Sequence, residues 1–516
     1  MRAKYRGSFG GAYLKPALHW QVSYFSRGGK KEIGQVIIDD ISGRVLEQWT
    51  GFQVAWTMAR GYPGAFGRHL NALYIWLPLC VLFVLPFINF RRPFSLLHLD
   101  LLVLLSFSIS LAFFNHGHID ASVPLAYPPL LYLLARMLAL SRSRPSRRPA
   151  PPLKLLVPTS WLAFGVVFLL GFRIALNFVD SNVIDVGYAG VIGAQRIVQG
   201  KPLYGSYPAD NEHGDTYGPV NYEAYVPFQQ VFGWSGHWDD LPAAHAAAVA
   251  FDVLALGLIF LLGRRVRGPT LGIALAYAWV SYPFTLYALN CNANDTLVAV
   301  LVLAALLAAT SAPARGALAA LAGLTKFAPL ALAPLLATHG LSRRGAQRGA
   351  GESAAGGASP APRAPPPRRL ALFLGAFALA GALACVPALS HDSLHTIYQR
   401  TLAYQADRGS PFSVWGLYGG LAGVEGAVQA AAIVLAVALA LIPRSRDLVA
   451  LAAACAAVIL AAQLGIDHWF YLYIPWFAAL VLLALLGSLS PSPARGMAAA
   501  SEPARSSRPA VAVSSG

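Results

Sequence analysis

Apolar runs of about 17 to 22 residues, the length that an α-helix needs to cross a hydrocarbon core roughly 30 Å thick, recur along most of this chain. LALFLGAFALAGALACVPAL and DLVALAAACAAVILAAQLG are two of them. Neither alternates apolar with polar residues, as the strands of a transmembrane β-barrel would. The chain is 56% hydrophobic and only 12% charged, whereas about 25% of residues are charged in soluble domains. The sequence therefore predicts an all-α, multi-spanning membrane protein.

One segment, residues 316–337, does not fit a single crossing. Arg315 precedes it and Arg343-Arg344 follow it, so both of its flanks should face the cytoplasm. Because Lys326 and Pro329 interrupt it, we expect a re-entrant hairpin with Lys326 near its tip. The remaining runs predict about eleven spans in total, which include residues 72–90, 97–114, 122–140, 155–177, 243–263, 270–289, 370–389, 426–443, 448–465 and 471–488.

The basic residues lie in short connections beside the spans, for example in residues 141–149 and 264–267. Cytoplasmic loops of membrane proteins carry such an excess of Lys and Arg. Topology thus explains the net charge of +16, and we expect no nucleic-acid partner. The alternation of sides predicts a multi-pass protein of the plasma membrane with its amino terminus outside, although the Lys and Arg residues near that terminus oppose this orientation.

Residues 179–242 form a polar, acidic stretch between two apolar spans. From residue 179 to 240 it holds eight carboxylates and only two cations, Arg196 and Lys201. Its many Tyr, Gly and Pro residues suit an ordered cleft whose rings face a small polar ligand, so we interpret it as an active-site loop. The predicted topology puts the other polar clusters on the same, outer side: His213/Asp215, Asn292/Asn294/Asp295, Arg400/Gln405/Arg408 and Asp467/His468.

The sequence gives no sign of a cofactor. The four cysteines are scattered, and the acidic stretch has no HxH, DxD or HExxH spacing, so a divalent metal is only a minor alternative. A nucleotide-sugar enzyme would be expected to carry a soluble doubly wound domain, and no stretch is long and polar enough for one.

Residues 1–70 are soluble in character and predict strands joined by turns. Residues 36–38 run into the polar turn 39–43 and resume at 44–46, as in a β-hairpin. This piece resembles the small extracytoplasmic module called PepSY, which implies a small α/β segment. The first twenty residues contain no continuous apolar core, so no cleavable signal peptide is expected.

Four motifs, DVGYAGVIGAQRIVQGKPLYG, DTYGPVNYEAYVPF, LTKFAPLALAPLL and HWFYLYIPWF, resemble the family 87 glycosyltransferases of the GT-C membrane class. The resemblance covers about residues 155–488. It implies a hexosyltransferase that moves a sugar, commonly mannose, or another hexose or a pentose, from a polyprenyl-phosphate donor to an extracytoplasmic glycan or glycolipid acceptor. Residues 71–150 would be a three-span extension of the membrane domain 151–488, with a disordered linker at 340–368 and a disordered tail at 489–516.

The resemblance assigns the catalytic base to Asp185, which heads an Asp-x-x-Tyr motif. Asp180 is the alternative, and both could instead cap the loop helix. A base would take the proton of the acceptor hydroxyl while cations stabilise the leaving phosphate. The expected donor and substrate contacts are Lys326, Arg400, Arg408, Gln405, Tyr188, Tyr217 and His468.

Several of these residues have simpler explanations. Lys326 could extend its ammonium to a membrane interface instead of a phosphate, and Arg400 and Arg408 could be surface ion-pair residues. His468 could anchor the interface instead of stacking on a sugar. Arg173 and Asp252, which lie inside spans, could pair across helices or line the cleft.

Two other functions fit the pattern. A transporter or flippase of lipid-linked sugars would tolerate neutralisation of Asp185 as long as it binds its substrate. A non-catalytic envelope protein would depend on residues 1–70 and not on the acidic stretch.

Overall fold

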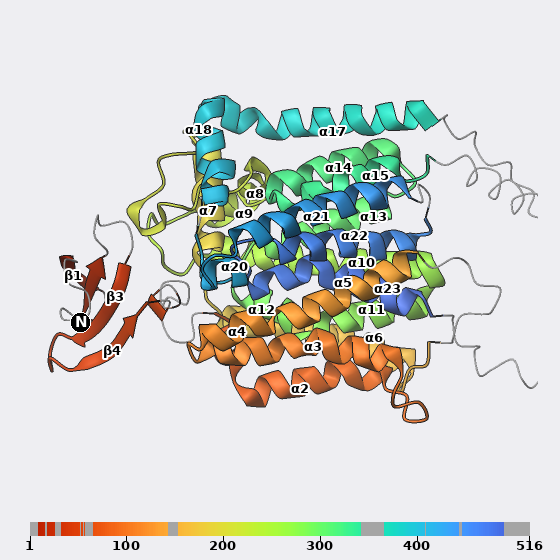
Figure 1. Ribbon diagram of the computed structural model, residues 1–516, viewed down its shortest axis with the longest axis horizontal. Helices are drawn as coiled ribbons and strands as arrows, with labels where there is room; N and C mark the ends of the chain where they lie inside the picture. Colours follow the sequence, from red (N-terminus) through yellow and green to blue (C-terminus); the bar gives the residue numbers. More distant parts are fainter. Residues whose placement is uncertain are drawn as a thin grey trace, which may run out of the picture.

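The structure, a computed structural model, describes residues 9–15, 18–25, 32–51, 53–54, 56, 66–142, 153–341, 366–407, 409–442 and 446–489. Most of these residues are helical and lie in one bundle, with a small antiparallel sheet at one end of it (Figure 1). Most of the expected linker 340–368 and of the tail from 489 lies outside the described residues.

The sheet confirms the hairpin expected near the amino terminus. Its strands β1 (Phe9–Lys15), β2 (His19–Phe25), β3 (Glu32–Asp39) and β4 (Val45–Thr50) pair in sequence order, all antiparallel. Ile38 pairs with Val45, and the turn between them is closed by a 2.7 Å hydrogen bond from the Ser42 amide to Asp39 Oδ1. All regular structure described before residue 51 is strand, and the described residues 53, 54 and 56 are helical.

Residues 71–142, the expected three-span extension, pack into the same core as the later helices. The Tyr277 hydroxyl donates to the Leu82 carbonyl, and the Tyr282 hydroxyl donates to the Leu104 carbonyl. The first helices are η1 (Arg68–Asn71), α2 (Leu73–Val84), η2 (Leu85–Phe87), α3 (Leu96–Asn115), α4 (Ile119–Leu125) and α5 (Tyr127–Ser141).

The expected span 270–289 is broken into two helices, α11 (Pro269–Ser281) and α12 (Pro283–Asn290), bent by 56°. Pro283 lacks an amide hydrogen and forces Tyr282 before it into an extended conformation. The break frees carbonyl groups at the end of α11, and Arg173 donates to two of them (Trp279 and Val280). The neighbouring helices are α6 (Thr159–Asp180), α10 (Pro242–Arg267) and α13 (Asp295–Leu307).

The segment around Lys326 folds back on itself, as expected. It comprises α14 (Ala312–Thr325), η4 (Ala328–Leu332) and α15 (Ala333–Thr338), with Lys326 at the turn. The Arg315 guanidinium near the start of α14 donates to the carbonyls of Leu336 and His339 at the end of α15. Both arms of the hairpin therefore meet at one end of the bundle.

The last part of the bundle has a buried centre and an exposed edge. Helices α22 and α23 are buried along most of their length, whereas α17 lies along one edge of the bundle (Figure 1) and α17 and α21 leave most of their residues exposed. The elements are α17 (Pro366–Leu389), α18 (Leu394–Tyr398), the π-helical turn η5 (Gln399–Ala403), α19 (Tyr404–Asp407), α20 (Val414–Leu417), α21 (Ala422–Leu441), α22 (Leu448–Leu464), η6 (Tyr471–Tyr473) and α23 (Ile474–Gly487).

Fewer helices than expected are long enough to cross a membrane. Among the described residues, six pass on length and composition, or seven when the bent pair α11–α12 counts as one span. Several other expected spans contain shorter apolar helices, for example Leu448–Leu464. A membrane protein is thus supported, while the number of crossings stays a prediction.

Candidate functional site

The acidic stretch folds into short helices that gather at the same end of the bundle as the sheet (Figure 1). They are α7 (Asp185–Val198), η3 (Ala209–Asn211), α8 (Pro219–Glu223) and α9 (Val226–Phe232). Gly187 lets α7 lie directly on the turn between α12 and α13, because a side chain there would collide with the Asn292 carbonyl. Gly190 faces the ring of Tyr225 in the same close way. Gly187 and Gly190 of the first motif are thus packing positions.

A second close approach joins the acidic stretch to the hairpin. Gly218 lies so near the Leu324 carbonyl that any side chain at 218 would collide with it. The Tyr-Gly-Pro turn before α8 therefore rests on the hairpin tip, next to Lys326. The contact unites two of the four motifs, which are about a hundred positions apart in the chain.

Lys326 is buried at this junction and forms an ion pair with Asp295 (Nζ–Oδ1 2.6 Å). Its side chain is only 8% exposed, which excludes extension to an interface. The Trp476 indole donates to the same carboxylate oxygen at 3.0 Å, and Nζ lies 5.3 Å from the ring centres of Tyr217, Tyr473 and Trp476. Rings from two other motifs thus surround the ammonium group of Lys326, which cation–π attraction stabilises further.

Several buried polar side chains beside this ion pair have hydrogen-bonding atoms without a partner among the described residues. Asn294 donates from its side-chain amide to Asn221 Oδ1. Among the described residues, no hydrogen-bond partner is found for Asp295 Oδ2, Asn294 Oδ1, Asn221 Nδ2 or the Tyr225 hydroxyl, all of which are buried. Unsatisfied buried polar atoms are costly and are concentrated at functional sites or around bound water.

The two candidate bases have different surroundings. Asp185 is the first residue of α7 and is exposed, and its charge acts on buried Asp295. Asp180, at the end of α6, accepts hydrogen bonds from the His69 amide (3.1 Å) and from His69 Nδ1 (2.9 Å). It also lies 3.5 Å from Arg68 Nε. Asp180 thus attaches η1 to α6, whereas the Asp185 side chain faces solvent at the rim of the site.

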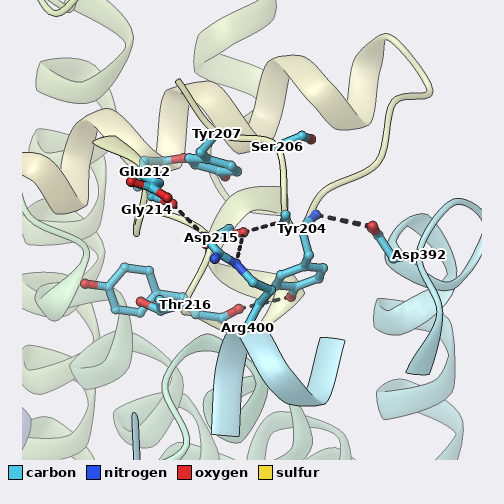
Figure 2. A network of polar contacts seen from close by, with 12 residues as sticks. Tyr204, Ser206, Tyr207, Glu212, Gly214, Asp215, Thr216, Asp392 and Arg400 are labelled. Carbon is cyan, nitrogen blue, oxygen red and sulfur yellow. Dashed lines mark hydrogen bonds and ion pairs between the residues drawn. The ribbon is translucent and has the colours of Figure 1, made fainter. Parts of the chain in front are cut away.

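Arg400 is held by Asp215 (Figure 2). Its Nε and Nη2 atoms donate to the two carboxylate oxygens of Asp215, each at 2.7 Å, and Nη2 also donates to the Glu212 carbonyl. The hydrogen bonds to Asp215 raise the pKa of the guanidinium above its usual value. This forked pair ties η5 to the acidic stretch, so Arg400 is more than a surface ion-pair residue.

A second carboxylate ties α17 to the same stretch. Asp392 follows α17, and its Oδ2 accepts a 2.7 Å hydrogen bond from the Leu203 amide. Figure 2 shows it beside the backbone of Tyr204. Partial burial raises the pKa of Asp392. Two independent contacts therefore fix the connection 390–407 on the acidic stretch.

The remaining expected contacts are spread over this end of the molecule. Tyr188 is buried, stacks on Trp238 with ring centres 5.1 Å apart and donates to Asp210 at 3.3 Å, so it packs inside the loop. Gln405 lies near the Thr216 carbonyl at 3.5 Å. His468 shares a 2.8 Å hydrogen bond with the Ser410 hydroxyl. Arg408 lies outside the described residues.

Glu223, at the end of α8, is a candidate that the sequence interpretation missed. Burial raises the pKa of its carboxyl to about 7. No ion pair or hydrogen bond to this carboxylate is found in the described part of the chain, and its charge acts on Cys385 of α17. The sequence did offer one sign of its burial, because Glu223 lies between Tyr222 and the apolar residues that follow. A carboxyl that titrates near neutral pH can accept or donate a proton.

Within the described ranges, no group of three or more His, Cys, Asp or Glu side chains is placed to hold a metal ion. The groups that meet at the site are a carboxylate, an ammonium group, side-chain amides and aromatic rings. These groups suit hydrogen bonding to hydroxyls, contact with a phosphate and stacking on a sugar.

Comparisons with protein-family models, with curated proteins and with solved structures find no match to this chain.

Proposed function

We propose that the protein is a membrane glycosyltransferase that transfers a hexose or pentose from a polyprenyl phosphate to a glycan or glycolipid on the outer face of the plasma membrane. The observation that carries this proposal is the exposed carboxylate of Asp185 beside the buried Lys326–Asp295 pair and its rings. An exposed carboxylate near a buried ammonium group and aromatic rings has the parts that glycosyl transfer needs.

In the proposed reaction, the acceptor hydroxyl oxygen attacks the anomeric carbon and forms the new glycosidic bond. The bond from that carbon to the phosphate oxygen breaks, and its electron pair leaves with the polyprenyl phosphate. Asp185 takes the hydroxyl proton. Lys326 has three N–H donors, of which Asp295 Oδ1 takes one, so we assign it to the phosphate. Arg400, held by Asp215, is the second cation assigned to this role.

Asp185 is preferred to Asp180 because it is the more exposed of the two carboxylates. Asp180 is bound to His69 and Arg68 and serves to attach η1 to α6. Asp185 instead lies at the rim, where an acceptor can reach it.

The test is transfer by purified Asp185→Asn with a polyprenyl-phosphate sugar as donor. Asparagine keeps the volume and can still bond the helix terminus, but it cannot accept the proton, so turnover should fall about 10²–10⁴-fold. Asp180→Asn is the matched control and should retain most activity. Full activity of Asp185→Asn would exclude it as the base. Loss in Asp180→Asn alone would move the role to that residue.

The same variants distinguish a glycosyltransferase from the two alternative functions, a flippase and a non-catalytic envelope protein. A flippase would move the lipid-linked sugar across vesicles at an unchanged rate in Asp185→Asn. If the protein is a non-catalytic envelope protein, the wild type would transfer no sugar from any polyprenyl-phosphate donor.

A further inference from the structure

A cavity of about 430 Å³ lies at the end of the bundle away from the acidic stretch. Helix α10 begins at Pro242, directly after that stretch, and its 26 residues place Arg267 at the opposite end, about 39 Å away. The charged and polar side chains of the lining are Arg265, Arg267, Arg446, His339, Asp447 and Thr310. None of them belongs to the site proposed for glycosyl transfer.

The lining carries an excess of positive charge, with three arginines and one carboxylate. Asp447 is partly engaged as the cap of α22, where its Oδ1 accepts the Ala450 amide at 2.7 Å. Burial, together with the charges of Arg315 and Arg446, lowers the pKa of His339 to about 4. At neutral pH it is therefore an uncharged hydrogen-bonding group, and the cationic excess attracts anions.

Contacts with helix ends hold two of the arginines in place. Arg267 donates from Nε to the Gly487 carbonyl at the end of α23 (2.7 Å), and Arg265 donates to the Leu307 carbonyl at the end of α13. A guanidinium has five N–H donors in a planar fork. A fixed guanidinium that caps a helix end through one nitrogen can still contact a ligand through the others, at little cost in side-chain entropy.

We propose that this cavity binds a phosphate-bearing anion, either the headgroup of an anionic lipid or a free phosphate compound from solution. Forked guanidinium donors match phosphate oxygens. The volume is within the range of about 300–1,000 Å³ that is usual for small-molecule sites, and it exceeds that of a single water or chloride. Val266, Leu448 and Val449 add an apolar wall, against which the glyceride part of a lipid would pack.

The test measures thermal unfolding of the purified full chain in three settings. These are phosphatidylcholine vesicles, the same vesicles with phosphatidylglycerol, and phosphatidylcholine vesicles with sodium pyrophosphate. Stabilisation by phosphatidylglycerol alone identifies a lipid site, and stabilisation by pyrophosphate identifies a site for a soluble phosphate, since a ligand that binds only the folded state raises its stability.

Arg267→Gln should weaken the stabilising ligand about 10-fold or more, because one charge-assisted hydrogen bond is lost. Arg264→Gln is the matched control, since it removes the same charge from the same helical turn without lining the cavity. Thr310→Glu tests the site without removing a helix cap, and its carboxylate should repel the anion. The proposal is overturned if neither probe stabilises the wild type, or if the control weakens binding as much as Arg267→Gln. The arginines would then serve only as helix caps and topology signals.

Discussion

Two buried ion pairs, Arg173–Asp252 and Lys326–Asp295, differ in how completely they are bonded. Arg173 donates to both oxygens of Asp252 and also to Trp279, Val280 and Thr285. Trp279 Nε1 donates back to Asp252. Lys326 has one hydrogen bond to Asp295, and Asp295 Oδ2 finds no partner among the described residues.

The difference teaches how a structural pair can be told from a functional one. A buried charge is tolerated when its donors and acceptors are satisfied, and the first pair meets this condition while it closes the broken end of α11. The second pair keeps unused hydrogen-bonding capacity beside Tyr217, Asn221 and Asp185. Unused capacity at buried charges is what a substrate could satisfy, so the comparison favours the second pair as the functional one.

The largest effect is expected from Arg173→Met. It leaves Asp252 buried without a cation and removes the donors to the carbonyls of α11, and breaking a buried pair costs about 3–5 kcal/mol. The unfolding temperature in detergent should fall sharply. The double variant Arg173→Met/Asp252→Leu, which buries no charge, should recover much of it. A single variant as stable as wild type would remove the distinction between the pairs.

Lys326→Met should destabilise less, by roughly 1–3 kcal/mol, because Asp295 retains Trp476 and can take up a proton. Its main effect should be on donor affinity, which we expect to fall at least about 10-fold on loss of one charged hydrogen bond. Binding of a polyprenyl-phosphate sugar and thermal unfolding are measured together. In the double variant Lys326→Met/Asp295→Asn, thermal stability should return to about the wild-type level, whereas the affinity for the donor should stay low. Unchanged affinity in the single variant would make this pair structural too.

Glu223 extends the comparison to a carboxyl for which the described residues offer no hydrogen bond or ion pair. Its pKa is raised from 4.5 to about 7 in the folded state, so the protonated form is favoured by folding and stability falls as pH rises through that window. Glu223→Gln should abolish this fall and be more stable at pH 8 by roughly 1–2 kcal/mol, after allowance for solvent screening. The exposed carboxylate variant Glu212→Gln is the control. Equal pH profiles for wild type and Glu223→Gln would contradict the assignment.

The smallest effect is expected at Asp180, whose pair with Arg68 and His69 is partly exposed. Such pairs contribute about 0.2–1 kcal/mol. Asp180→Asn should therefore lower the unfolding temperature slightly, with donor affinity unchanged, and His69→Gln should behave alike. A loss as large as that of Arg173→Met would show that the attachment of η1 to α6 supports the whole bundle.

The amino-acid sequence by itself determined the class of the fold. The apolar runs predicted helices where helices occur, the turn at residues 39–43 predicted the hairpin of β3 and β4, and the two arginine flanks predicted that the segment around Lys326 folds back. These features are local in the chain: run length, turn chemistry and the charge on each side of a segment.

Only the tertiary structure decided which side chains meet. Lys326 pairs with Asp295, Arg400 with Asp215 and Arg173 with Asp252, and each pair joins residues from different helices or loops. Spacing along the chain carries no information on such distant contacts, because they depend on how helices pack. The raised pKa of Glu223 and the break before Pro283 were missed for the same reason: burial and the fate of freed carbonyl groups are properties of the packed bundle.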